Sequence, residues 1–153
     1  MGGALFNRGG VVTIKNSTLS QNKAQGGYTY GNVATVDHSL GSAIFNLDGT
    51  LIVQFSTLAN NLALQPDAGP SPRMDGGAIF NKQVGGSAIL RLDNSILADT
   101  QNNQTDFFND GGLITGSQSN IVEINGAGAN GLPGGLLLPG NGNPLLGPLA
   151  NNG

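Results

Sequence analysis

Two stretches of the sequence, 23–40 and 62–75, hold the side chains best suited to binding a ligand. Tyrosine rings can stack on the faces of sugars, while carboxylates and a guanidinium can hydrogen-bond to hydroxyl groups. The first stretch carries tyrosines, an aspartate and the chain's single histidine, and the second carries aspartates and an arginine. The alternative is a pair of solvated loops whose tyrosines pack on the rest of the fold. The candidate ligand-binding residues are Tyr28, Tyr30, Asp37, His38, Asp67, Arg73 and Asp75.

The same residues would be the starting set for an enzyme, either a polysaccharide lyase or a glycoside hydrolase. A glycosidase needs two carboxylates about 5 to 9.5 Å apart, and a lyase needs a base together with a metal ion or an arginine. Asp37, His38, Arg73 and Asp75 could fill these roles, but nothing in the sequence fixes their mutual geometry. The other acids are scattered along the chain. No residue is therefore assigned as catalytic, and a non-enzymatic function is favoured.

Composition excludes several classes of protein and partner. The 153 residues include 26 glycines and only 10% charged residues, which argues against a helical bundle. Six lysines and arginines against nine acids give a net charge of −3, so we expect neither nucleic acid nor an anionic membrane as a partner. No stretch approaches the roughly 20 apolar residues of a membrane span. An export signal, if the protein has one, would lie outside this chain.

The sequence also offers no metal site and no cofactor site. Cysteine is absent, which excludes a disulfide framework and thiolate ligands. A glycine pattern at 126–131 fits the dinucleotide-binding spacing, but Pro133 prevents the helix that must follow and no βαβ unit surrounds it. We therefore expect no cofactor and no bound metal.

An internal repeat defines the expected fold. The motif Gly-Gly/Ser-Ala-Ile/Leu-Phe-Asn occurs at 2–7, 41–46 and 76–81, and a degenerate copy stands at 106–109. Each copy is followed by two further apolar runs separated by glycine or asparagine, and in the third copy the match is delayed by four residues. Three short strands per repeat predict an all-β protein, a right-handed parallel β-helix or solenoid of about four coils over 1–125. The Gly/Pro/Leu-rich stretch 126–153 is expected to form an irregular C-terminal cover.

Stacked coils place equivalent residues in ladders. The amides of Asn7, Asn46, Asn81 and Asn109 are expected to form one ladder, and Asn22 and Asn61 another. The Gly-Gly of the motif should supply a positive φ at a tight corner. The sequence leaves open whether the phenylalanine column faces inward. An internal apolar ladder is predicted for Leu5, Ile44, Ile79 and Phe107.

The repeat resembles the right-handed β-helix repeats of bacterial cell-surface and secreted proteins, including the polymorphic outer-membrane proteins. Gly2 to Leu5 and Gly76 to Ile79 carry that family's Gly-Gly-Ala-Ile motif, and Leu19 to Asn22 carries its Phe-x-x-Asn motif with leucine in place of phenylalanine. The stretches 94–98, 106–109, 119–122 and 143–153 are similar to the closing section of large anchored β-helix exoproteins. The resemblance implies an extracellular or cell-surface location, and it does not imply an activity.

These observations predict a rigid stalk or adhesin-like carbohydrate-binding module whose partner is an extracellular glycan or a host or neighbouring cell surface. Stretches 23–40 and 62–75 occupy the same place in successive repeats, so they should emerge from one corner on adjacent coils. No polar capping segment precedes Gly2 in this sequence. Two outcomes stay open: self-association through the N-terminal coil, as a closed head-to-head dimer rather than a head-to-tail filament, or a monomer whose first coil is frayed.

Overall fold

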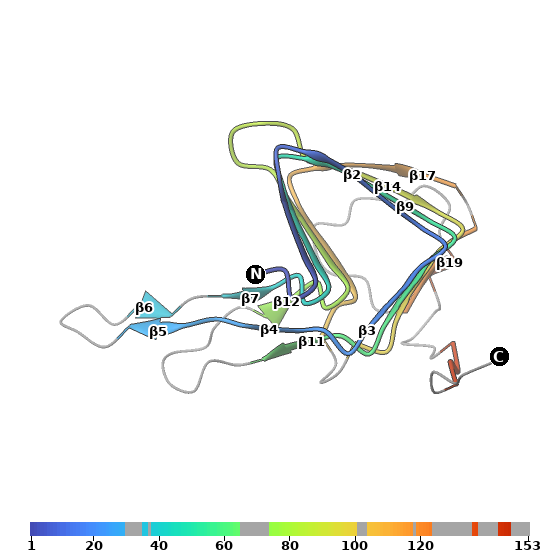
Figure 1. The fold of residues 1–153 in the computed structure, drawn as a ribbon, viewed down its shortest axis with the longest axis horizontal. Helices are drawn as coiled ribbons and strands as arrows, with labels where there is room; N and C mark the ends of the chain where they lie inside the picture. Colours follow the sequence, from blue (N-terminus) through green and yellow to red (C-terminus); the bar gives the residue numbers. More distant parts are fainter. Residues whose placement is uncertain are drawn as a thin grey trace.

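The computed structural model describes residues 1–29, 35–36, 38–64, 74–100, 104–117, 119–123, 136–137 and 144–147. All regular elements within these ranges are β-strands. Parallel strands are stacked into three main sheets, and seen along the stack the sheets form the sides of a triangle (Figure 1). None of the described residues belongs to a helix that could cross a membrane.

Each main sheet takes one strand from every repeat. The first sheet consists of β1 (Leu5–Arg8), β8 (Ile44–Leu47), β13 (Ile79–Lys82) and β16 (Phe107–Asp110). The second consists of β2 (Val11–Lys15), β9 (Thr50–Gln54), β14 (Ile89–Asp93) and β17 (Leu113–Gly116). The third consists of β3 (Thr18–Ser20), β10 (Thr57–Ala59), β15 (Ile96–Ala98), β18 (Ile121–Val122) and β19 (Leu136–Leu137). We call one strand from each sheet, in chain order, a coil, and the strand order is consistent with a parallel β-helix or solenoid.

The predicted register is confirmed. Leu5 pairs with Ile44, Ile44 with Ile79, and Ile79 with Phe107. Their side chains face the interior of the triangle, where leucines and valines of the other two sheets complete one apolar core. Burial of each such side chain contributes about 1.5–3 kcal/mol. Stacking of like residues in successive coils therefore accounts for the main core.

The phenylalanine column faces outward, which decides the question that the sequence left open. Because Ile44 and Ile79 point inward, the alternation of a strand turns Phe45 and Phe80 to the opposite face. Their rings stack with centroids 5.3 Å apart, and Phe80 stacks on Phe108 at 5.2 Å. Phe45 and Phe80 are nevertheless buried, because Leu40 packs against them from outside the triangle. The column thus forms a second, smaller core.

Positive φ at the corner glycines is also confirmed. Gly2, Gly41 and Gly76 have φ of 63°, 63° and 62°. A Cβ at Gly41 would collide with the backbone carbonyl of Ile44, so only glycine fits there. The following position holds Ser42 in the second coil, whereas a Cβ at Gly3 or Gly77 would collide with its neighbours.

Asparagine side chains form the predicted ladder beside the core. The Nδ2 group of Asn7 donates to Oδ1 of Asn46 at 2.8 Å, Asn46 donates to Asn81 at 2.7 Å, and Asn81 donates to Asn109 at 2.7 Å. Asn22 and Asn61 are joined in the same way at 3.0 Å. These amides hold successive coils in register.

The two inserted stretches leave and rejoin adjacent coils together, as predicted. At their starts, β4 (Lys23–Gln25) pairs in parallel with β11 (Leu62–Leu64), and at their ends β7 (Ser39–Leu40) pairs in parallel with β12 (Met74–Asp75). Within the first insert, β5 (Tyr28–Thr29) and β6 (Thr35–Val36) form an antiparallel pair. Figure 1 shows these strands extending from one corner of the triangle.

A four-residue insertion in the third coil produces the predicted delay in the repeat. It lies between β13 and β14, and the carboxylate of Asp48 in the coil beside it accepts the backbone N–H groups of Val84 at 2.7 Å and Gly85 at 3.2 Å. These hydrogen bonds, the first above all, hold the pKa of Asp48 below its usual value. Asp48 thus anchors the inserted loop. Of the expected C-terminal cover, β19 extends the third sheet and 144–147 is described, while the remainder of 126–153 lies outside the described residues.

Candidate functional site

The structure places only some of the residues that the sequence singled out. Tyr30, Asp37, Asp67 and Arg73 lie outside the described residues. Tyr28 lies in β5. His38 is exposed just before β7, and Asp75 is half-buried at the end of β12. Because β7 and β12 pair, these last two residues lie on adjacent coils, and the assignment of the whole set stays a prediction.

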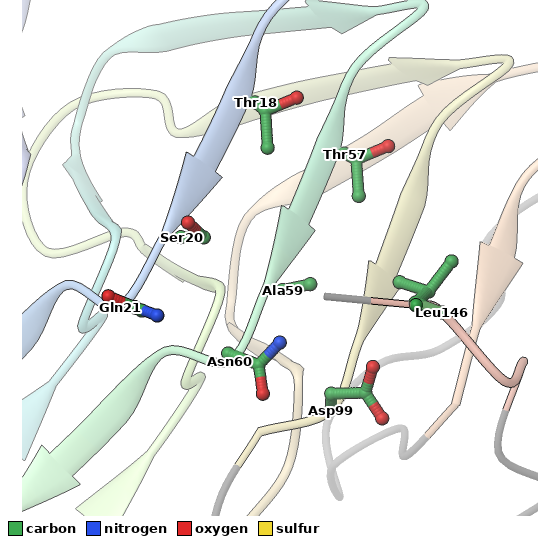
Figure 2. A pocket seen from close by; sticks show the side chains of 9 residues that line it. Thr18, Ser20, Gln21, Thr57, Ala59, Asn60, Asp99 and Leu146 are labelled. Atoms are coloured by element: carbon green, nitrogen blue, oxygen red, sulfur yellow. The ribbon is translucent and has the colours of Figure 1, made fainter. Parts of the chain in front are cut away.

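The described residues form a groove elsewhere, on the outer face of the third sheet. The groove has a volume of about 550 Å³ and is lined by six polar residues together with three residues that have apolar or no side chains. Figure 2 shows these side chains on the strands of three successive coils. The apolar part of the wall comes from Ala59 and, in the C-terminal stretch, from Leu146 and Gly147. The other lining residues are Thr18, Ser20, Gln21, Thr57, Asn60 and Asp99.

Strand alternation positions the hydroxyl groups of the groove. Leu19 and Leu58 pair in register and point into the core, so the residues on either side of them point outward. Thr18 and Thr57 therefore project side by side from neighbouring strands (Figure 2). Ser20 adds a third hydroxyl group at the end of the first of these strands.

A column of corner residues forms the polar edge of the groove. Gln21, Asn60 and Asp99 directly follow β3, β10 and β15, and their φ angles are 58°, 57° and 53°. A non-glycine residue in this left-handed conformation costs of order 1 kcal/mol or more, although asparagine and aspartate tolerate it best. Because all three adopt the same conformation, their side chains leave the corner as a ladder spaced by about 4.8 Å per coil.

A second hollow adjoins the groove at the same corner. It has a volume of about 310 Å³ and is lined by Gln21, Lys23, Asn60 and Leu62. Gln21 and Asn60 line both hollows, so together they make one continuous surface that runs from the third sheet to β4 and β11. The exposed Lys23 brings a positive charge to this surface.

The charged groups of the groove are not paired with each other or with other described residues. Among the described ion pairs, Lys82 binds Asp110 at 2.8 Å and Arg91 binds Asp93 at 2.7 Å. The side chains of Lys23 and Asp99 take part in none of them. The backbone N–H of Asp99 donates to Oε2 of Glu123 at 2.6 Å, so a second carboxylate lies beside Asp99 on the next coil.

A third hollow, of about 360 Å³, lies on the second sheet and offers a poorer site. Its carboxylate, Asp93, is buried and accepts hydrogen bonds from Arg91 at 2.7 Å and Gln54 at 3.1 Å. Burial raises the pKa of Asp93, but the hydrogen bonds from Gln54 and Arg91 outweigh it, so the pKa lies below its usual value. A carboxylate held in this way is a weak base.

The described residues provide no group of three histidine, aspartate or glutamate side chains that could hold a metal ion. In the groove, Asp99 is the one carboxylate among the described lining residues. A glycosidase needs a pair of carboxylates flanking the scissile bond. Asp99 and the neighbouring Glu123 are carboxylates at one end of the groove, and the hydroxyl and amide groups beside them can hydrogen-bond to a polar ligand.

The sequence contained a signal for this groove that the motif analysis did not use. In the Leu-x-x-Asn repeats, the residue before the asparagine is Gln21 in the first coil and Asn60 in the second, and Asp99 occupies the same place in the third. A corner that only had to turn the chain could be glycine in each coil. Three different polar residues at one repeat position indicate a surface column.

The described residues define an all-β protein of stacked parallel strands with a polar groove on the outside of one sheet. No protein-family model, no curated protein and no solved structure matches the chain.

Proposed function

We propose that the chain is a right-handed parallel β-helix of about four coils that serves as a non-enzymatic, adhesin-like binding module on a rigid stalk. In this proposal it belongs to a bacterial surface or secreted protein and lies outside the cell. The groove on the third sheet binds a glycan, and the C-terminal stretch covers the last coil. Stacked sheets with side-chain ladders between coils support the rigid part of this proposal.

One observation carries the binding part of the proposal, namely the column of polar side chains along the groove, which form no side-chain hydrogen bond with the part of the chain that the structure describes. Hydroxyl groups of Thr18 and Thr57 and amides of Gln21 and Asn60 repeat along the axis of the stack. A glycan also repeats, and its hydroxyl groups both donate and accept hydrogen bonds. A rigid scaffold holds the protein's groups in place before binding, which lowers the entropy lost on association.

A glycan array probed with the purified chain tests the proposal, followed by titration calorimetry with any glycan that binds. Asn60→Ala should weaken that binding. Asn94→Ala is a matched control, because Asn94 has φ of 48° at an exposed corner but does not line the groove. Equal loss of binding in both variants, or binding to no glycan, would contradict the proposal. Release of reducing or unsaturated ends from a polysaccharide, if it depended on Asp37, Asp75 or Asp99, would instead support the alternative of a glycoside hydrolase or a polysaccharide lyase.

We also propose that the first coil mediates self-association. No described strand pairs with the outer edges of β1, β2 or β3. Leu5, Val12, Ile14 and Leu19 are only partly buried, whereas their equivalents in the second coil are fully buried. At the other end of the stack, Phe107 is fully buried. A head-to-head contact between two first coils would therefore cover the larger exposed cross-section.

A further inference from the structure

The continuous surface formed by the groove and the second hollow carries opposite charges at its two ends. Lys23, which lines the second hollow, lies in the first coil beside Gln21, the uncharged Asn60 lies in the second coil, and Asp99 lies in the third. Coils are spaced by about 4.8 Å, so the two charged positions are separated by roughly 10 Å along the axis. Glu123 strengthens the negative end, because its carboxylate accepts the backbone N–H of Asp99.

The two charges are available to a ligand. Neither Lys23 nor Asp99 forms an ion pair with a described residue, whereas Lys82 and Arg91 are each paired with an aspartate. The nearest charge-bearing neighbours of Asp99 on its own sheet include Glu123, which is also negative. Nothing described at this end of the groove neutralises it.

This layout discriminates between classes of glycan. A polyanionic glycan would gain at Lys23 but would be repelled by Asp99 and Glu123. A polycationic glycan would be attracted by Asp99 and Glu123 but repelled by Lys23. A ligand with an amine at one end and a carboxylate at the other satisfies both, while an uncharged ligand uses only the amides and hydroxyl groups between them.

We propose that the groove selects a zwitterionic oligosaccharide, with a free amino group bound at Asp99 and a carboxylate bound at Lys23. This inference rests on the proposed glycan-binding function and adds its specificity. The orientation is fixed by the charges: the amino sugar lies over the third coil and the acidic sugar over the first. Thr18, Thr57 and the two amides bind the sugars between them.

The test uses one trisaccharide with an amino sugar at one end, a neutral sugar in the middle and a uronic acid at the other end, prepared in four forms. These are the zwitterion, the N-acetylated anion, the carboxyl-reduced cation, and the neutral form with both changes. Two exposed ion pairs predict that the zwitterion binds about 2- to 30-fold more tightly than the neutral form at low salt. At about 1 M salt the Debye screening length falls to about 3 Å, so most of the difference in affinity between the zwitterion and the neutral form should disappear.

Charge-removing variants assign each end. Asp99→Asn should abolish the preference for the free amine and leave the preference for the carboxylate, and Lys23→Gln should do the opposite. Lys15→Gln is the matched control, because Lys15 lies in the first coil near the ring of Phe55 and outside the groove. It should change neither preference.

The outcomes separate this inference from the proposal on which it rests. Equal binding of all four forms, weakened by Asn60→Ala, would overturn the charge selectivity and leave a glycan-binding groove. Tightest binding of the anionic or the cationic form would overturn it as well. Binding of no form would contradict both statements.

Discussion

Replacement of Asn46 by alanine should remove a large part of the stability of the stack. Asn46 is fully buried in the middle of the asparagine ladder. Its Oδ1 accepts from Asn7 at 2.8 Å, and its Nδ2 donates to Asn81 and to the carbonyl of Gly49, both at 2.7 Å. Alanine deletes these three hydrogen bonds and leaves buried partners that water cannot reach.

The size of the effect follows from the partners that are left. Each buried polar group without a partner costs about 1–3 kcal/mol, so three lost bonds predict a loss of about 3–9 kcal/mol. A small domain has a free energy of unfolding of about 5–15 kcal/mol, so the variant should be close to unfolding. With a slope of about 2 kcal/mol per molar urea, the midpoint should fall by roughly 1.5 to 4.5 M.

Asn7→Ala provides the internal comparison. Asn7 begins the ladder and donates to Asn46 and to the carbonyl of Gly10, which is exposed to water. Its loss should cost only about 1–3 kcal/mol, because one buried acceptor is left without a partner. Urea unfolding followed by circular dichroism measures both variants. A midpoint for Asn46→Ala equal to that of the parent, or a greater loss for Asn7→Ala, would refute the reasoning.

Three further results are expected. Ile44→Asp places a charge between two coils and should cost several kcal/mol; a melting temperature within a few degrees of the parent would show that the core is assigned wrongly. The pKa of Asp48 is lowered in the folded protein, so Asp48 contributes fully to the free energy of unfolding above its unfolded pKa near 3.8, and this contribution is lost as the pH falls through the lower folded pKa. Asp48→Asn should therefore flatten the acid side of a plot of melting temperature against pH. An unchanged slope would refute this. Sedimentation velocity should detect a dimer that the double change Leu5→Lys and Val12→Lys converts to monomer, and a single monomeric species at every concentration would exclude the association.

The repeat made the interior of the fold predictable from the sequence. A stacked coil can bury an inward residue only against its equivalents above and below, so the match between Leu5, Ile44 and Ile79 sufficed to set the register that the structure confirms. The asparagine ladder followed from the same alignment. The direction in which Phe45 faces could not be predicted in this way, because either of two adjacent apolar residues can face the core. The choice depends on whether a residue of the insert covers the one that faces outward. Leu40 supplies that cover from beyond the repeat.

The outer face was harder to predict because no packing requirement ties one coil to the next there. Core positions repeat the same residue type, whereas the corner column changes from Gln21 to Asn60 to Asp99. A search for repeats disregards such differences in residue type. They nevertheless change the column from uncharged amides in the first two coils to a carboxylate in the third. A site on such a scaffold is therefore found by comparing coils position by position and asking where the residue type drifts while the backbone conformation stays constant. On this chain two corners meet that description: Asn16, Phe55 and Asn94 have φ of 50°, 49° and 48°, and Gln21, Asn60 and Asp99 have φ of 58°, 57° and 53°. Only the second column is polar in every coil, and it is the one that lines the groove.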